Sequence, residues 1–208
     1  MRRILLSLLS ALLLSGVARA QIPVTDAANI TQSIVNSVTE LVQTSTTAEN
    51  MIGNFKETMK IYRQGKEYYD GLRKVKNLVR DARKVQQTIL LVGELSDIYV
   101  TSYDKMLTDD NFSSAELSAI AAGYNKLMER GMNSLKDLKE IVNPTDYSMT
   151  DKERLDRIDQ AHGELTHTRD LMVYYTRKNI SVSYLRSQRK NDTQRVLDLY
   201  GSPDEKYW

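Results

Sequence analysis

The pattern of hydrophobic and polar positions along the chain predicts long helices. Apolar residues recur at alternating spacings of three and four over residues 30–62, 72–99, 117–141 and 155–199. This spacing gathers them on one stripe of an α-helix, as in the seams between packed helices. No segment alternates apolar and polar residues as a half-buried strand does. We therefore expect an all-α protein, an elongated bundle of three to four long helices with heptad-like packing stripes.

Three sequence signals mark helix ends. Ser113 with Glu116, and Thr150 with Glu153, have the spacing of a capping box, in which each residue pairs with a free backbone amide of the other. Pro144 cannot continue a helix, and it disfavours helical geometry at the residue before it. We expect the third helix to end there.

The helix could break at two places, one within the first stripe and one between the first stripe and the second. Residues 44–49 include Thr46 and Glu49, a further capping-box pair that would end one helix and begin the next. A continuous helix with a polar patch fits this segment equally well. Gly65 and Gly71 mark the second place, because glycine weakens a helix interior.

The first twenty residues have the features of a secretory signal. A positive start at Arg2 and Arg3 precedes an apolar run over residues 4–14 and a small-residue cleavage box at residues 18–20. The run is shorter than the roughly 20 apolar residues that span a bilayer. We expect cleavage after residue 20 and a periplasmic or extracellular protein; the alternative is an uncleaved anchor.

The remainder, residues 21–208, is expected to form one helical domain. It would have a short N-terminal arm over residues 21–25, a loop near residues 143–149 and a flexible tail over residues 201–208. No cysteine occurs, which excludes disulfides, thiolate nucleophiles and a lipidated cysteine. Beyond the signal no segment is apolar enough to span a bilayer, so we expect no stable membrane insertion after cleavage.

The net charge of the chain bears on which partners it could bind. The chain has 29 Lys and Arg against 27 Asp and Glu, and losing Arg2, Arg3 and Arg19 with the signal leaves 26 against 27, a net charge of about −1. A near-neutral chain has no global charge that would attract nucleic acid, and we expect no specific nucleic-acid partner.

The residues that carry chemistry form no recognisable catalytic or metal-binding pattern. His162 and His167 are five residues apart, about 140° around a helix, so they cannot share a metal ion as an i, i+4 pair does. Asp159 precedes His162 by three residues, which is half of a dinuclear-bundle motif, but no second copy occurs. We predict a non-enzymatic protein without catalytic residues, cofactor or metal.

Two basic segments allow two interpretations. Residues 73–84 place four cations on one helical stripe, and six more gather near the C-terminus: Arg177, Lys178, Arg186, Arg189, Lys190 and Arg195. They form either a surface for an anionic partner or a solvated face. We prefer the solvated face, because the exported chain is nearly neutral.

Tyrosine is in excess, with twelve Tyr against two Phe and one Trp. An apolar ring with a polar tip suits half-exposed positions and interfaces. A docking surface is therefore predicted at Tyr62, Tyr68, Tyr69, Tyr174 and Tyr184. The alternative for each of them is a packing role in the core or at the rim of the bundle.

The start of the predicted mature chain carries a family resemblance. Pro23, Val24, Asp26, Asn29 and Ile30 lead directly into the first helix. In this it resembles the TrbJ-like family, which includes the TraI proteins of conjugative transposons and is related to minor-pilus proteins of type IV secretion systems. The resemblance implies an exported, helical, non-catalytic subunit of a mating apparatus that contacts other secretion-system or pilus proteins and, at a pilus tip, the recipient cell surface.

The same segment supplies the first candidate contact site. Asp26 would cap the first helix, leaving Ile22, Pro23 and Val24 as an apolar arm. The arm either docks on a partner, together with Asp26 and Asn29, or folds back on the bundle as a hydrophobic staple. The alternative function, of a different class, is a periplasmic helical chaperone or ligand-binding module for apolar clients.

Overall fold

The computed structural model describes residues 24–76, 78–143 and 149–202, and these contain six α-helices and no strand. The expected all-α class is confirmed, whereas the expected number of three to four helices is wrong. The helices are α2 (Val24–Thr44), α3 (Ala48–Lys74), α4 (Arg80–Leu107), α5 (Ser114–Val142), α6 (Asp151–Lys190) and α7 (Thr193–Tyr200). None of the helices in this part of the chain is long and apolar enough to cross a membrane.

The first apolar stripe is divided between α2 and α3. α2 ends at Thr44, and Thr47 caps α3 by accepting a hydrogen bond from the amide of Asn50 at 3.2 Å. The break at residues 44–49 is thus real, although Thr47 provides the cap and not the Thr46–Glu49 pair. α3 then runs unbroken through Gly65 and Gly71.

The chain breaks again between α3 and α4, where the apolar pattern predicted a continuous helix. The sequence placed Leu72, Val75 and Val79 in one helix, but α3 ends at Lys74 and α4 begins at Arg80. Val75 and Val79 are exposed in the connection. The buried Gln86 of α4 donates hydrogen bonds to the carbonyls of Leu72 at 2.6 Å and Val75 at 3.1 Å, which ties down the end of α3.

The remaining helix ends follow the sequence signals more closely. Both predicted capping boxes are present, Ser113 with Glu116 on α5 and Thr150 with Glu153 on α6. α5 ends at Val142, before Pro144, which lies outside the described residues. α6 ends at Lys190, and the residue that caps it, Asn191, has a left-handed conformation (φ 55°) that turns the chain back into α7.

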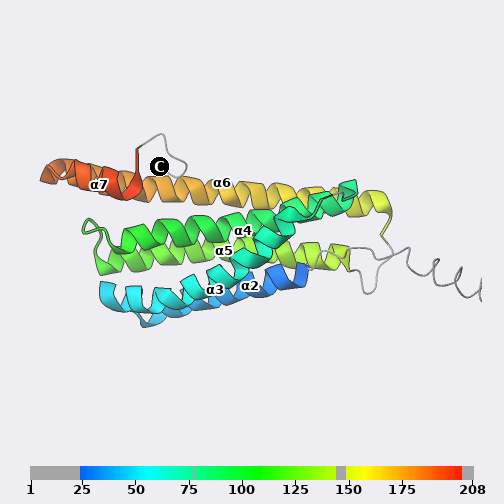
Figure 1. Cartoon of the computed structure of the whole chain (residues 1–208), viewed down its shortest axis with the longest axis horizontal. Helices are drawn as coiled ribbons and strands as arrows, with labels where there is room; N and C mark the ends of the chain where they lie inside the picture. Colours follow the sequence, from blue (N-terminus) through cyan, green and yellow to red (C-terminus); the bar gives the residue numbers. More distant parts are fainter. Residues whose placement is uncertain (1–23, 77, 144–148, 203–208) are drawn as a thin grey trace, which may run out of the picture.

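The helices are arranged around α4 and α5. In Figure 1, α6 and α7 lie on one side of this pair and α2 lies on the other. α3 packs against α2 and α4 and runs obliquely across them (Figure 1). α6 packs along both α4 and α5, and α7 folds back on α6.

An aromatic cluster joins four of the helices in the core. Phe55 of α3, Tyr99 and Tyr103 of α4, Tyr124 of α5 and Tyr175 of α6 form a chain of ring contacts with centroids 5.1–5.8 Å apart. Edge-to-face and offset contacts of this kind stabilise beyond the burial of the rings. Part of the tyrosine excess is therefore core packing.

Candidate functional site

The predicted N-terminal contact site is only partly described. Ile22 and Pro23 lie outside the described residues. Val24 is the first residue of α2 and is 1% exposed, so it packs within the core. Asp26 lies inside the first turn of the helix and not at a cap, where its carboxylate still favours the positive end of the helix dipole. Asp26 and Asn29 are exposed to solvent.

The five candidate tyrosines lie in two places. Tyr62, Tyr68 and Tyr69 share α3, where the rings of Tyr68 and Tyr69 meet edge to face with centroids 5.3 Å apart. Tyr174 and Tyr184 lie on α6; Tyr174 is 59% exposed, whereas Tyr184 packs against the core. Sequence reasoning treated them as one docking surface, and the structure separates them.

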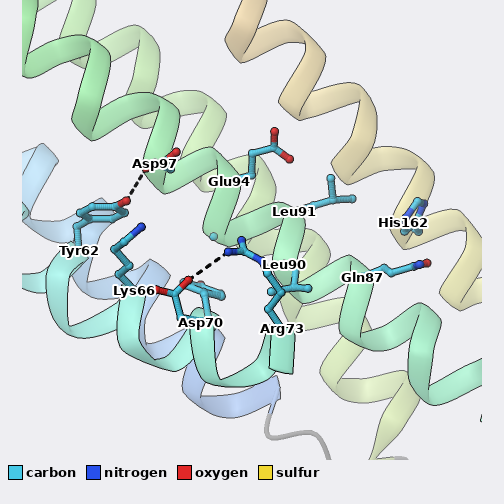
Figure 2. Close-up of a pocket in the computed structure, with 12 residues that line it drawn as sticks. Tyr62, Lys66, Asp70, Arg73, Gln87, Leu90, Leu91, Glu94, Asp97 and His162 are labelled. Atoms are coloured by element: carbon cyan, nitrogen blue, oxygen red, sulfur yellow. Dashed lines mark hydrogen bonds and ion pairs between the residues drawn. The ribbon is translucent and has the colours of Figure 1, made fainter. Parts of the chain in front are cut away.

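A cleft of about 720 Å³ opens between α3, α4 and α6 beside the first group. Tyr62 and Tyr69 line it together with the charged residues Lys66, Asp70, Arg73, Glu94 and Asp97 and with His162 (Figure 2). The hydroxyl of Tyr62 donates a hydrogen bond to Asp97, and Arg73 pairs with Asp70 at 3.2 Å. The cleft therefore presents both signs of charge beside the apolar side chains of Leu90 and Leu91.

One wall of this cleft depends on a close helix approach. The ring of Tyr69 lies over Gly93, and a Cβ atom added at Gly93 would meet the ring at 2.7 Å. Only glycine leaves room for the ring there. The approach of α3 to α4 at the cleft is set by this contact.

His162 faces the cleft without a metal-binding partner set. Burial, and then the nearby Lys84 ammonium, lower the pKa of His162, which favours the neutral imidazole. Asp159, the other half of the sequence pattern, pairs with Lys84 at 3.2 Å. Within the described ranges, no group of three or more His, Cys, Asp or Glu residues is placed to hold a metal ion.

A buried polar network at the other end of the molecule was not predicted from the sequence. Asp109, in the turn after α4, has a fully buried side chain, and four donors converge on its carboxylate. These donors are the amide of Asn111 at 3.0 Å, the hydroxyl of Ser183, the guanidinium of Arg195 at 3.3 Å and the hydroxyl of Tyr200 at 2.8 Å. We call this set the Asp109 clasp, because it fastens α7 and the end of α6 to the α4–α5 turn.

A second ion pair reinforces the same end. Arg186 donates to both carboxylate oxygens of Glu116, the capping residue of α5, and to the carbonyl of Asn111 at 2.6 Å. The hydrogen bonds from Arg186, and then those from Ser113, lower the pKa of Glu116 to about 2. Two cations of the C-terminal basic cluster, Arg186 and Arg195, are thus engaged inside the fold.

The other side of α6 carries the accessible part of that cluster. Tyr174, Val182 and Leu185 are 59%, 40% and 59% exposed. Arg177, Lys178 and Arg189 are exposed beside them, and the Lys178 ammonium lies 5.3 Å from the centre of the Tyr174 ring. We call these six residues the outer face of α6. At helical spacing they fall on the side opposite the buried Met172, Thr176 and Ser183.

Comparison with known proteins finds a partial match to a family model without an assigned function. Residues 3–55 match a family model described as a domain of unknown function, DUF4141. The match covers about a quarter of the chain, including α2 and the first turns of α3. No curated protein and no solved structure matches the chain.

Proposed function

We propose that the protein is an exported, non-enzymatic assembly subunit of a conjugative type IV secretion system, a minor-pilus or periplasmic pilus-assembly component needed for DNA transfer. In this proposal residues 1–20 are removed on export to the periplasm or to the pilus. The helices act as one elongated bundle that contacts other secretion-system or pilus proteins and, at a tip, the recipient cell surface.

The outer face of α6 is the observation that carries this proposal. Tyr174, Val182 and Leu185 expose apolar surface on one stripe, where a helix of a monomer normally presents polar residues. Exposed apolar side chains that lie on one face of a helix, with cations beside them, support an interaction site there. The choice of a conjugative type IV secretion system rests on the resemblance to the TrbJ-like family, which is carried by Pro23, Val24, Asp26, Asn29 and Ile30.

A second candidate function is favoured by the cleft between α3, α4 and α6. A periplasmic chaperone or ligand-binding module needs an accessible concave surface with apolar and polar lining, and the cleft offers Leu90 and Leu91 beside Lys66 and Glu94. In that case the cleft, and not the outer face of α6, is the working surface. Substitution of Lys66 and Leu91 would then abolish binding of unfolded test proteins such as reduced lysozyme.

The proposal is tested by deleting the gene in a donor strain and measuring DNA transfer to recipient cells. We expect transfer to fall to the level of a donor without the machinery, and to return when the full chain is supplied in trans. A chain with Ala18→Asp and Ala20→Asp, which destroys the cleavage box, should not restore it. Unchanged transfer after deletion, with normal expression of the neighbouring genes, contradicts the proposal.

A further inference from the structure

The charges on the C-terminal half of α6 are all of one sign. Residues 171–191 contain no Asp or Glu and five Lys or Arg residues. Two of the five are occupied within the fold, Arg186 by Glu116 and Lys190 by the side-chain oxygen of Asn111 at 2.8 Å. The other three, Arg177, Lys178 and Arg189, are exposed and make no ion pair within the described part of the chain.

These three cations lie beside the exposed apolar residues of the same helix. Tyr174, Lys178, Val182, Leu185 and Arg189 follow one another at spacings of four, four, three and four, so they form one ridge on the helix. From Tyr174 to Leu185 the ridge is about 16 Å long at 1.5 Å per residue. It is one helix wide, which is the shape that packs into the groove of a second helix.

We propose that the outer face of α6 docks an acidic amphipathic helix of a partner protein. The apolar residues of that helix cover Tyr174, Val182 and Leu185, and its carboxylates pair with Arg177, Lys178 and Arg189. The inference rests on the proposed function only in taking the partner to be another subunit of the secretion machine. The chemistry of the partner follows from the charge and shape of the face.

The charges and the shape of the outer face of α6 also argue against two other occupants, a second copy of the chain and a lipid surface. Two copies of the chain meeting through this ridge would bring Arg177, Lys178 and Arg189 close to their own equivalents, and like charges oppose such pairing. A lipid surface needs a broader apolar face, commonly with Trp, Phe or Leu inserted several ångströms into the headgroup region. Three partly exposed side chains on a ridge suit a protein helix better.

Site-specific photo-crosslinking in donor cells tests the inference with the full chain. A photoreactive phenylalanine analogue replaces Leu185, and in a control chain it replaces Lys136, an exposed residue of α5. We expect position 185, and not position 136, to yield an adduct with one other protein. The cross-linked peptide of that protein should carry apolar residues at spacings of three and four and a net negative charge.

Charge variants make the test specific. The triple substitution R177E, K178E and R189E should lower the yield of the adduct at least tenfold, and the neutral R177Q, K178Q and R189Q chain should lie between it and the wild type. The matched reversal K126E, K136E and K139E changes three exposed lysines of α5 and should leave the yield unchanged. Thermal unfolding of each purified chain shows that the fold is retained.

Several results would overturn the inference. They are an adduct of twice the chain mass, a lipid adduct, a basic or non-helical cross-linked peptide, a yield that the charge reversal leaves unchanged, or no adduct at position 185. A failure of the proposed function can be distinguished from a failure of this inference, because the function is tested by measuring DNA transfer from the deletion strain. If deletion leaves DNA transfer unchanged but position 185 still yields an adduct with an acidic helix, the proposed function is refuted and the docking face stands. If deletion abolishes transfer, while the triple charge-reversal variant transfers DNA normally and gives the wild-type adduct yield, the docking face is refuted and the proposed function stands.

Discussion

At the scale of single residues, Asp109 shows what the sequence could not reveal. Asp109, Asp110 and Asn111 are typical turn residues, and their pattern indicates only an exposed connection. The structure buries the carboxylate of Asp109 under Arg195 and Tyr200, which are 86 and 91 residues later in the chain. Burial of this carboxylate depends on α7 folding back on α6, which no local spacing encodes.

Replacing Asp109 with Asn should strongly destabilise the fold. The change removes the charge that Arg195 faces and turns one acceptor oxygen into a donor, so the free energy of unfolding should fall by about 3 kcal/mol. Urea denaturation followed by circular dichroism measures it. Asp110→Asn is the matched control at the exposed neighbour, and its effect should stay below about 0.5 kcal/mol. Equal effects of the two substitutions would show that the clasp contributes nothing.

Two helical glycines should respond to alanine with opposite signs. At Gly93 the new Cβ would lie 2.7 Å from the buried ring of Tyr69, and such overpacking costs about 1–3 kcal/mol. At Gly163 nothing lies within 4 Å, so Gly163→Ala should gain up to about 1 kcal/mol from helix propensity. Melting temperatures of the two variants measure the contrast. A stabilising Gly93→Ala would mean that the ring of Tyr69 moves aside freely.

At the scale of elements, the sequence located helices well and their ends unevenly. The capping boxes at Ser113 and Thr150 are local patterns, and both were predicted. The break after Lys74 was missed because Val75 and Val79 are apolar and in phase with the stripe of the next helix. Hydrogen bonds from Gln86, a residue of α4, fix this end, and a contact between helices leaves no signature in the periodicity.

Replacing Gln86 with Leu should loosen the end of α3. Without the two hydrogen bonds to the carbonyls of Leu72 and Val75, the last turn should open more often, and trypsin should cut after Arg73, Lys74 and Lys76 several-fold faster. Limited proteolysis followed by mass spectrometry gives the rates. The control is Gln87→Leu, at the exposed neighbour, and the prediction fails if the two variants are cut equally fast.

The tie between α5 and α6 should make stability depend on pH. The folded state lowers the pKa of Glu116 from its ordinary value of 4.5 to about 2, so the carboxylate contributes stability above pH 4.5 that is lost as the pH falls towards 2. Glu116→Gln should remove this part of the acid sensitivity. Melting temperatures measured between pH 2 and 7 should show a flatter slope below pH 4.5 for Glu116→Gln than for the control Glu140→Gln, an exposed residue of the same helix.

At the scale of the whole molecule, the pattern predicted the fold class but not the use of its surfaces. The basic cluster near the C-terminus was interpreted as one solvated face. The structure divides it, with Arg186, Lys190 and Arg195 bonded within the fold and Arg177, Lys178 and Arg189 without an ion pair in the described residues. The packing of α4, α5 and α7 against α6 decides which of these cations meets a carboxylate. This packing cannot be predicted from the charge pattern alone.

The α2–α3 pair, which extends beyond the segment matched by the family model, should not fold by itself. α2 packs against α5 as well as α3, and the side chain of Asn125 donates to Thr39 at 3.0 Å across that interface. A peptide of residues 24–74 leaves the buried Ile34, Val38 and Leu41 partly uncovered, and most of the stability of helices in proteins comes from such tertiary packing. Circular dichroism should show little helix and no cooperative melting, in contrast to the full chain. A cooperative transition of the peptide would show that α2 and α3 form an independent unit.

The Asp109 clasp also orders events in time. Ribosomes make a chain from its N-terminus, so the turn after α4 emerges well before Arg195 and Tyr200, the residues that cover it. Until they arrive, the carboxylate lacks two of its four hydrogen-bond donors. A chain that is cut short before α7 therefore differs from a finished one by an uncovered, protease-accessible end, and closure of the clasp distinguishes complete molecules from incomplete ones.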